Sequence, residues 1–208
     1  MLIKNDYVAK HDVEFVKEND SMKYALDKLE ETGYRCIPVL DESGSTYVGN
    51  IYKVDLLEYE REHSLEGPLK ELVSDQDGFV KEDDPFFKVF SSIKRLPFLA
   101  IIDDSGEFIG ILTNGNVIQV LENAWGANIG SYSLTIGTLE YSGVLRKMLK
   151  IVNKYCNVQS VISLNNGSKY VRRVCIVLPE EADEQMVNSI KKDMDKNNFT
   201  VTDVEKLN

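Results

Sequence analysis

The sequence predicts an α+β fold in which one small helix-and-strand unit occurs twice and a second kind of unit follows. The prediction starts from an internal repeat, because the stretch RCIPVLDESG at residues 35–44 is echoed by FLAIIDDSG at residues 98–106. After residue 127 the repeat ends. A segment of alternating apolar and polar residues follows, and after it come segments with the apolar spacing of amphipathic helices. We therefore expect three units with the boundaries 1–65, 66–127 and 128–208.

The first copy opens on a strand-like lead and an amphipathic helix. The lead is VEFVKENDS at residues 13–21. The helix is predicted by apolar residues at positions i, i+3, i+4 and i+7, which are Met22, Ala25, Leu26 and Leu29. Ser21, with Asp20 as the alternative, is expected to cap the start of this helix and Gly33 to end it.

Two short strands and a second helix complete each copy. In the first copy, the apolar runs CIPVL and YVGNIY flank the turn residues DESG, and VDLLEYEREH is the expected helix. The second copy has the lead DGFVKEDDP, a helix after Pro85, the strands FLAII and FIGILT, and the helix NVIQVLENAW. Asp41 matches Asp103 and Gly49 matches Gly110. Each copy buries little apolar surface alone, so we expect the two to pack together.

The last third predicts the element order β-α-β-β-α-β, which is the ferredoxin-like pattern. Alternation of residues from Tyr132 to Thr138 indicates the first strand. The apolar spacing within GVLRKMLKIVNKYC indicates the first helix. NVQSVISLNN and KYVRRVCIVLP are expected to form a hairpin around Asn166–Gly167. A helix in EADEQMVNSIKKDMDKNN and a strand in FTVTDVEKL complete the unit.

Composition and charge narrow the class of protein. The 208 residues carry a net charge of −10, which disfavours non-specific binding to nucleic acid or to an anionic membrane. No apolar run approaches the roughly 20 residues that a membrane-spanning helix needs. Three isolated cysteines fit a reducing compartment, so we expect a cytoplasmic protein.

Catalysis and metal binding are disfavoured by the residues present. The two histidines, His11 and His63, lack the spacing of metal ligands, and neither a P-loop nor a G-x-G-x-x-G motif occurs. We expect no catalytic residues, no metal and no cofactor. An anionic ligand would need a local group of basic side chains, for which Arg35, Lys53 and the stretch SIKRLP at residues 92–97 are the candidates.

The repeated pattern resembles the CBS domain, two of which in tandem make a Bateman module. The resemblance rests on the apolar–Pro–apolar–Asp strand, the G-x-x-[ST]-x-x-D end and their duplication over about residues 7–126. In the last unit, LEYSGVLRKMLKIV resembles the strand-to-helix corner of the ACT domain, where that family typically binds amino acids, and Glu140 and Gly143 match its acidic residue and glycine. Ser142 departs from the proline common there, and a dimerisation or scaffold role without a ligand is the alternative.

The CBS resemblance implies a cleft for an adenine nucleotide, lined by three stretches of each copy. Apolar and backbone groups would hold the adenine, an acidic side chain the ribose, and hydroxyl groups or a helix N-terminus the phosphate. Carried over residue by residue, the expected nucleotide-binding residues are Val13, Phe15, Tyr34, Arg35, Cys36, Pro38, Tyr52, Lys53, Asp55, Phe79, Val80, Arg95, Leu96, Pro97, Phe98, Thr113 and Asn116.

Each copy departs from the family pattern at one position. Tyr52 replaces the usual hydroxyl residue although Asp55 keeps the acid, whereas Thr113 keeps the hydroxyl and Asn116 replaces the acid. Several of these residues have structural alternatives: Cys36, Pro38, Tyr52 and Phe98 as strand or core residues, and Asp55 as a helix cap. Two arginines near one cleft favour a ligand that carries phosphate.

The order of CBS pair and ACT-like unit, with GYRCIPVLDE, GNIYK and PFFKVFSSIKRLP, resembles the cyclic di-AMP-binding CBS–ACT proteins of Gram-positive bacteria. The resemblance implies a non-catalytic cytoplasmic receptor for cyclic di-AMP that forms a homodimer and acts on an effector protein of unknown identity. The alternatives are an AMP or ATP sensor, an amino-acid sensor working through the ACT-like unit, and a ligand-free dimeric scaffold.

Overall fold

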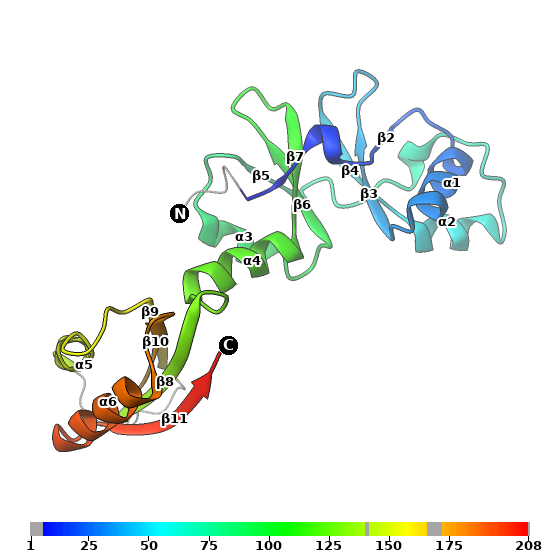
Figure 1. Cartoon of the computed structure of the whole chain (residues 1–208). Coiled ribbons are helices and arrows are strands. Elements are labelled where there is room, and N and C mark those ends of the chain that lie inside the picture. The colour runs from blue at the N-terminus through cyan, green and yellow to red at the C-terminus, as the bar shows by residue number, and fades with distance from the viewer. Residues whose placement is uncertain (1–5, 140–141, 166–171, 208) are drawn as a thin grey trace. The chain divides into compact units, whose positions relative to one another are not determined.

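The computed structural model describes residues 6–139, 142–165 and 172–207, and it divides into two compact units, Met1–Val117 and Ile118–Asn208. The first unit contains both copies of the repeat, and the second contains the last sheet and its helices (Figure 1). Helix α4 (Asn114–Trp125) runs across the boundary between them. The fold class is α+β, as predicted, while the boundaries at residues 65 and 127 stay predictions.

The first copy forms a three-stranded sheet with two helices. Its elements are β2 (Val16–Lys17), α1 (Met22–Thr32), β3 (Cys36–Leu40), β4 (Tyr47–Tyr52) and α2 (Lys53–Glu60), and the strand order is β2-β3-β4. The start and end of α1 are those predicted. The Ser21 hydroxyl accepts a hydrogen bond of 3.2 Å from the Tyr24 backbone N–H, and Gly33 ends the helix with a left-handed φ of 72°.

The second copy repeats this order with a shorter first helix. Its elements are β5 (Phe79–Lys81), the 3₁₀ turn η3 (Phe86–Lys88), α3 (Val89–Ser92), β6 (Phe98–Ile102), β7 (Phe108–Thr113) and α4. After Pro85, the apolar residues with the helical spacing are buried (Phe86, Val89, Ile93) or half-buried (Phe90), but α3 has only four residues. Pro97 disfavours a helical conformation at Leu96, which limits how far the helix can continue.

Two chain segments cross from one copy to the other. Strand β1 (Val8–Ala9), at the N-terminal end, pairs with β7, so the second sheet has the order β1-β7-β6-β5 (Figure 1). The segment after the 3₁₀ turn η2 (Leu69–Glu71) in turn lies along β4, where Ser74 and Asn50 exchange two backbone hydrogen bonds of 2.8 and 3.0 Å.

The two copies also share a hydrophobic core. Leu40 and Tyr47 of the first copy pack with Ala100 and Phe108 of the second, and the rings of Tyr47 and Phe108 stack with their centroids 6.4 Å apart. This shared core joins the two repeats into one unit, as we expected from the small size of each.

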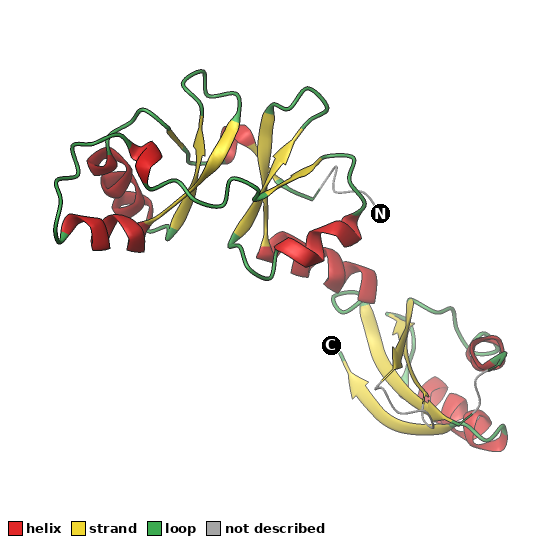
Figure 2. Ribbon diagram, turned by 180° about the vertical axis from the view of Figure 1, so that it is seen from behind, coloured by secondary structure: helices red, strands yellow, loops and turns green. Residues whose placement is uncertain are grey.

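The second unit has the predicted β-α-β-β-α-β order. Its elements are β8 (Gly130–Thr138), α5 (Val144–Val152), β9 (Ser160–Asn165), β10 (Arg172–Pro179), α6 (Glu184–Lys196) and β11 (Thr200–Lys206). The strands are antiparallel in the order β11-β8-β10-β9 and the two helices lie on one side of the sheet (Figure 2). Leu134 and Ile136 are fully buried against them. The expected turn at Asn166–Gly167 lies outside the described residues.

None of the helices in the described ranges combines the length and the apolar character that a membrane crossing requires.

Candidate functional site

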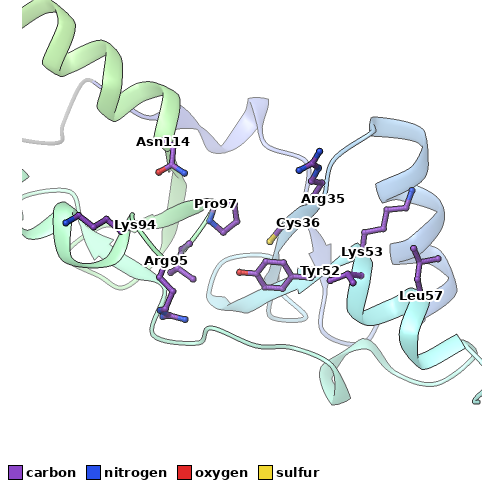
Figure 3. Close-up of a pocket in the computed structure, with 11 residues that line it drawn as sticks. Arg35, Cys36, Tyr52, Lys53, Leu57, Lys94, Arg95, Pro97 and Asn114 are labelled. Carbon is purple, nitrogen blue, oxygen red and sulfur yellow. The ribbon is translucent and has the colours of Figure 1, made fainter. Parts of the chain in front are cut away.

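A pocket of about 630 Å³ lies between the two copies of the repeat in the first unit (Figure 3). Its volume is within the range of small-molecule sites, roughly 300–1,000 Å³. The first copy contributes Arg35, Cys36, Tyr52, Lys53, Val54 and Leu57, and the second contributes Lys94, Arg95, Leu96, Pro97 and Asn114.

The repeat explains why these residues meet. Cys36 pairs with Tyr52 across the first hairpin, and Phe98 pairs with Thr113 at the same register across the second. In each copy, the residues before the first hairpin strand therefore lie beside the step from the second strand to the following helix. In both copies, the pocket is lined by the residues before the first hairpin strand and by the start of the helix after the second strand. Equivalent backbone segments therefore lie on its two sides.

Four basic side chains line the pocket, and two of them have acidic partners. The Lys53 ammonium lies 3.4 Å from Glu30 Oε1. The Arg95 guanidinium forms an ion pair with Asp75 and lies 3.5 Å from Asp77 Oδ1. In the part of the chain that the structure describes, Arg35 and Lys94 form no ion pair. Arg35 and Lys94 are therefore the lining cations left to pair with a ligand of negative charge.

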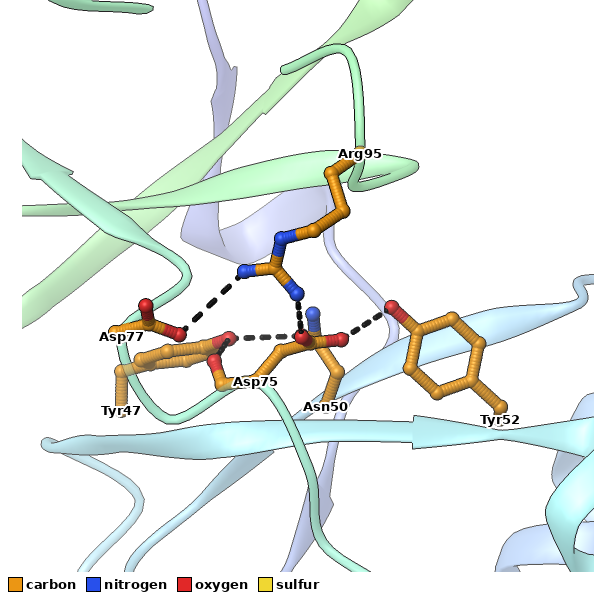
Figure 4. A network of polar contacts seen from close by, with 6 residues as sticks. All are labelled: Tyr47, Asn50, Tyr52, Asp75, Asp77 and Arg95. Atoms are coloured by element: carbon orange, nitrogen blue, oxygen red, sulfur yellow. Dashed lines mark hydrogen bonds and ion pairs between the residues drawn. The ribbon is translucent and has the colours of Figure 1, made fainter. Parts of the chain in front are cut away.

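A polar network connects two of the lining residues, Tyr52 and Arg95, through residues outside the pocket lining (Figure 4). The Tyr52 hydroxyl donates a hydrogen bond of 2.6 Å to Asp75 Oδ2, and Arg95 bonds the other carboxylate oxygen. The Tyr47 hydroxyl lies 3.1 Å from the Asp75 main-chain oxygen and 3.0 Å from Asn50 Oδ1. Burial, and then the bond to Asp75, raises the pKa of Tyr52 well above its ordinary value, so this hydroxyl stays protonated and donates.

The thiol of Cys36 is also neutral at physiological pH. Burial raises the pKa of Cys36 to about 12, although the hydrogen bond with Tyr52 acts in the opposite direction. A thiol in this state is a weak nucleophile, because the thiolate is the reactive form. The side chain therefore contributes a small apolar surface to the pocket.

The structure brings only part of the predicted site together. The predicted residues that line the pocket are Arg35, Cys36, Tyr52, Lys53, Arg95, Leu96 and Pro97. Pro38, Val80 and Phe98 are buried within the sheets instead, and Val13 and Phe15 pack against the core shared by the two copies. Pro38, Val80 and Phe98 are buried on strands β3, β5 and β6, whereas Val13 and Phe15 lie in the irregular segment before β2, and none of the five lies in the pocket wall.

Tyr34 and Phe79 are about half exposed, at 52% and 42%, and are not part of the pocket wall either. Asp55 lies in the first turn of α2, where burial and, to a smaller extent, Glu58 raise the pKa of its carboxyl. Tyr52, not Asp55, occupies the N-cap position of that helix. The assignment of Asp55 to a ribose stays a prediction.

Thr113 and Asn116 bond to each other at the start of α4. Asn116 Oδ1 accepts hydrogen bonds from the Thr113 backbone N–H at 3.1 Å and from its hydroxyl at 2.5 Å, and the Asn116 N–H donates back to Thr113 Oγ1 at 3.2 Å. This reciprocal pattern is the geometry of a helix cap. Both polar side chains are therefore already used within the protein.

At the ACT-like corner, Gly143 precedes α5 with a left-handed φ of 70° and is exposed. A residue with a Cβ would be strained in this conformation, which explains the glycine. Glu140, the other residue expected there, lies outside the described residues.

Sequence reasoning missed Asp75 and Asp77, and also Val54, Leu57 and Asn114. The two acids belong to SDQDG, which has the composition of an ordinary turn between elements. Nothing in that composition indicates that one carboxylate reaches Tyr52 and Arg95. Val54 and Asn114 could have been found, since each follows the strand end that the repeat places beside the pocket.

The comparisons with known proteins concern the same part of the chain. The family model for the CBS domain matches residues 3–62 and 69–123. A solved structure of a hypothetical conserved protein from Geobacillus kaustophilus has 27% identity and a TM-score of 0.54, covering 59% of this chain and 96% of that one. A CBS domain-containing protein of unknown function from Bacillus anthracis has 26% identity and a TM-score of 0.52, covering 59% and 93%.

A third solved structure, CbpB in complex with c-di-AMP, has 20% identity and a TM-score of 0.53 and covers 59% of this chain and 85% of that one. At this identity the likeness establishes the fold alone. A search of functionally curated protein sequences gave no match.

Proposed function

The chain belongs to the CBS domain family, and from this premise we propose that it is a non-catalytic, cytoplasmic regulatory protein that binds an adenine nucleotide, with cyclic di-AMP as the favoured ligand. The observation that carries the proposal is the 630 Å³ pocket between the two CBS repeats, with four basic side chains in its wall. A pocket of this size that combines apolar surface with a few convergent charges suits a phosphorylated purine.

The lining residues divide into two chemical groups. Tyr52, Leu57, Leu96 and Pro97 offer an aromatic ring and apolar surface to a purine, for which stacking on a ring is worth about 1–3 kcal/mol. The basic side chains, of which Arg35 forms no ion pair among the described residues, offer charge-assisted hydrogen bonds to phosphate. Such a site binds its ligand without a reactive group, since the Cys36 thiol is held neutral.

Cyclic di-AMP is favoured because its own symmetry matches that of the pocket. The ligand carries two equivalent nucleotides, and the pocket wall consists of equivalent segments of two repeats, the residues before β3 and β6 and the starts of α2 and α4. One protein of the same fold has been solved with c-di-AMP bound. AMP and ATP are the alternatives, because the same two groups of residues could receive either.

Isothermal titration calorimetry of the full chain with cyclic di-AMP, AMP and ATP tests the proposal. We expect saturable binding of cyclic di-AMP. Substitution Arg35→Gln removes one of the two cations without an ion pair and should weaken binding at least about tenfold, since a hydrogen bond to a charged group contributes about 1.5–3 kcal/mol.

Arg61→Gln is the matched control, because Arg61 is an exposed arginine at the end of α2 that does not line the pocket. It should leave the affinity unchanged. If none of the three nucleotides produces heat or raises the melting temperature, the nucleotide proposal is wrong and a ligand-free scaffold is the better description.

The second unit has a separate test. A thermal-shift panel of the common amino acids should give no shift if the ACT-like unit serves only for dimerisation, and sedimentation analysis measures whether the chain forms the expected homodimer. A specific shift with one amino acid that survives Arg35→Gln would favour the amino-acid sensor instead.

A further inference from the structure

Asp75 occupies a conformation that the fold imposes on it. It lies between η2 and β5 with a φ of 52°, in the left-handed region that non-glycine residues rarely adopt. Its neighbour Ser74 is paired with Asn50 on β4, and the Gly78 N–H donates a hydrogen bond of 2.8 Å to the Asp75 main-chain oxygen. These backbone contacts hold the side chain against Tyr52 and Arg95, which line the pocket, despite the unfavourable φ.

The Asp75 carboxylate connects the two repeats. One oxygen accepts the hydrogen bond from Tyr52 of the first repeat, and the other forms the ion pair with Arg95 of the second (Figure 4). The Asp75 side chain is 14% exposed, whereas that of Arg95 is 58% exposed. The less exposed of the two charges is therefore the acid, and solvent screens it less than it screens a surface carboxylate.

The ion pair changes how much charge the pocket offers to a ligand. Of the four basic side chains in the wall, Arg95 is neutralised by Asp75, and Lys53 lies beside Glu30. Among the described residues this leaves Arg35 and Lys94 without an acidic partner. Two uncompensated cations match a ligand with about two negative charges, such as a nucleoside monophosphate or a cyclic dinucleotide.

We propose that Asp75 determines the charge of the ligand that this pocket accepts, an inference that rests on the proposed nucleotide function. By occupying Arg95, the Asp75 carboxylate removes one cation from the site and places a negative charge directly behind two of its lining residues, Tyr52 and Arg95. A nucleoside triphosphate, with roughly twice the charge of the monophosphate, lacks matching cations and is repelled by this carboxylate. Specificity is obtained here by disfavouring the wrong ligand as well as by binding the right one.

Asp75→Asn separates the charge of the side chain from its shape. Asparagine tolerates the left-handed conformation, and its amide oxygen can still accept the hydrogen bond from Tyr52. The variant therefore keeps the ring of Tyr52 in place and leaves Arg95 with only the exposed Asp77 carboxylate beside it. Calorimetry of the full chain with ATP and AMP should show the ratio of ATP affinity to AMP affinity rising by about tenfold over that of the unsubstituted protein.

Three further variants make the test specific. Asp104→Asn removes the same charge from an exposed turn in the second hairpin and should leave the ratio unchanged. Asp77→Asn, at an 86% exposed side chain 3.5 Å from Arg95, should raise the ratio less than Asp75→Asn does, and its exposure makes it the safeguard if Asp75→Asn fails to fold. The double variant Asp75→Asn/Arg95→Gln should return the ratio toward that of the unsubstituted protein, because Asp75 acts through Arg95.

Failure of this inference is distinguishable from failure of the proposed function. If the unsubstituted protein binds AMP or cyclic di-AMP but the affinity ratio is the same with and without the Asp75 charge, only the role of Asp75 is overturned. If no nucleotide binds the unsubstituted protein or any variant, both proposals are overturned. An equal rise in the ratio for Asp104→Asn would attribute the effect to net charge and would also overturn the role of Asp75.

Discussion

Gly110→Ala should detach the N-terminal strand from the second CBS repeat. Gly110 of β7 pairs with Ala9 of β1, and a methyl group on Gly110 would overlap the main-chain oxygen of Val8 and lie 2.6 Å from a ring carbon of Tyr7. The tyrosine ring can rotate, but a main-chain oxygen cannot move without its strand. Either β1 leaves the sheet or β7 shifts away from it.

The expected loss of stability follows from the contacts that β1 makes in the folded protein. The strand pairs over two residues, and the Tyr7 hydroxyl makes a long contact of 3.5 Å with Glu82. With a net contribution of about 0.5–1.5 kcal/mol per hydrogen bond, we expect a loss of about 2–3 kcal/mol in the free energy of unfolding. For a unit of this size, such a loss lowers the melting temperature by roughly 10 °C.

Thermal unfolding followed by circular dichroism measures the shift, and amide hydrogen exchange at Val8 and Ala9 reports whether β1 has left the sheet. Gly115→Ala is the matched control, since the nearest atom to its added methyl would be Thr113 Oγ1 at an ordinary 3.6 Å. That change in the first turn of α4 should leave stability unchanged or raise it by up to about 1 kcal/mol. The reasoning is refuted if Gly110→Ala melts within about 2 °C of the unsubstituted protein and the amide protection of β1 is the same in both.

Three further changes have expected outcomes. The pKa of Asp41 is lowered from 3.8 to about 2, first by the hydrogen bond from the Thr46 backbone N–H, so the ionised carboxylate stabilises the fold above about pH 4 and this contribution is lost as the pH falls toward 2. The urea midpoint of Asp41→Asn should therefore change less with pH over this range than the midpoint of the unsubstituted protein. An equal change with pH in both proteins would contradict the assignment. Tyr52→Phe loses the bond to Asp75 but keeps the ring, so stability measured by urea should fall by about 1–2 kcal/mol, and no change would mean that the bond is absent in solution. Met148→Ala empties a fully buried position in the second unit and should cost about 2–5 kcal/mol in chemical denaturation, whereas a loss below 1 kcal/mol would contradict its burial.

Local chemistry was enough to predict most elements of the fold. The stripe from Met22 to Leu29, with Ser21 before it and Gly33 after it, predicted α1 with both its ends. The repeat predicted a hairpin and a helix in each copy, and period-two and helical patterns predicted the order of the last unit. These predictions succeeded because side-chain periodicity, caps and turn residues act within a few residues of each other.

The pocket was predictable only where the repeat itself fixes the position of a residue. Arg35 and Pro97 precede equivalent strands, and Tyr52 and Lys53 lie at a strand-to-helix step, so the hairpin register brings them to the pocket. Phe98 was expected beside them, but its strand position turns it into the core. Which face of a strand is buried depends on what packs against it, and that is a tertiary property.

The amino-acid sequence alone determined the doubled unit, its helices and hairpins, and the glycines shared at positions 49 and 110. Only the tertiary structure decided which chain segments pack on those glycines. The residues around Ser74 lie against Gly49, and β1 lies against Gly110. The same crossing brings Asp75 to Tyr52 and Arg95. The physical reason is that such contacts join residues 20 to 103 positions apart, where no local propensity acts and only the packing of the two sheets selects the partner.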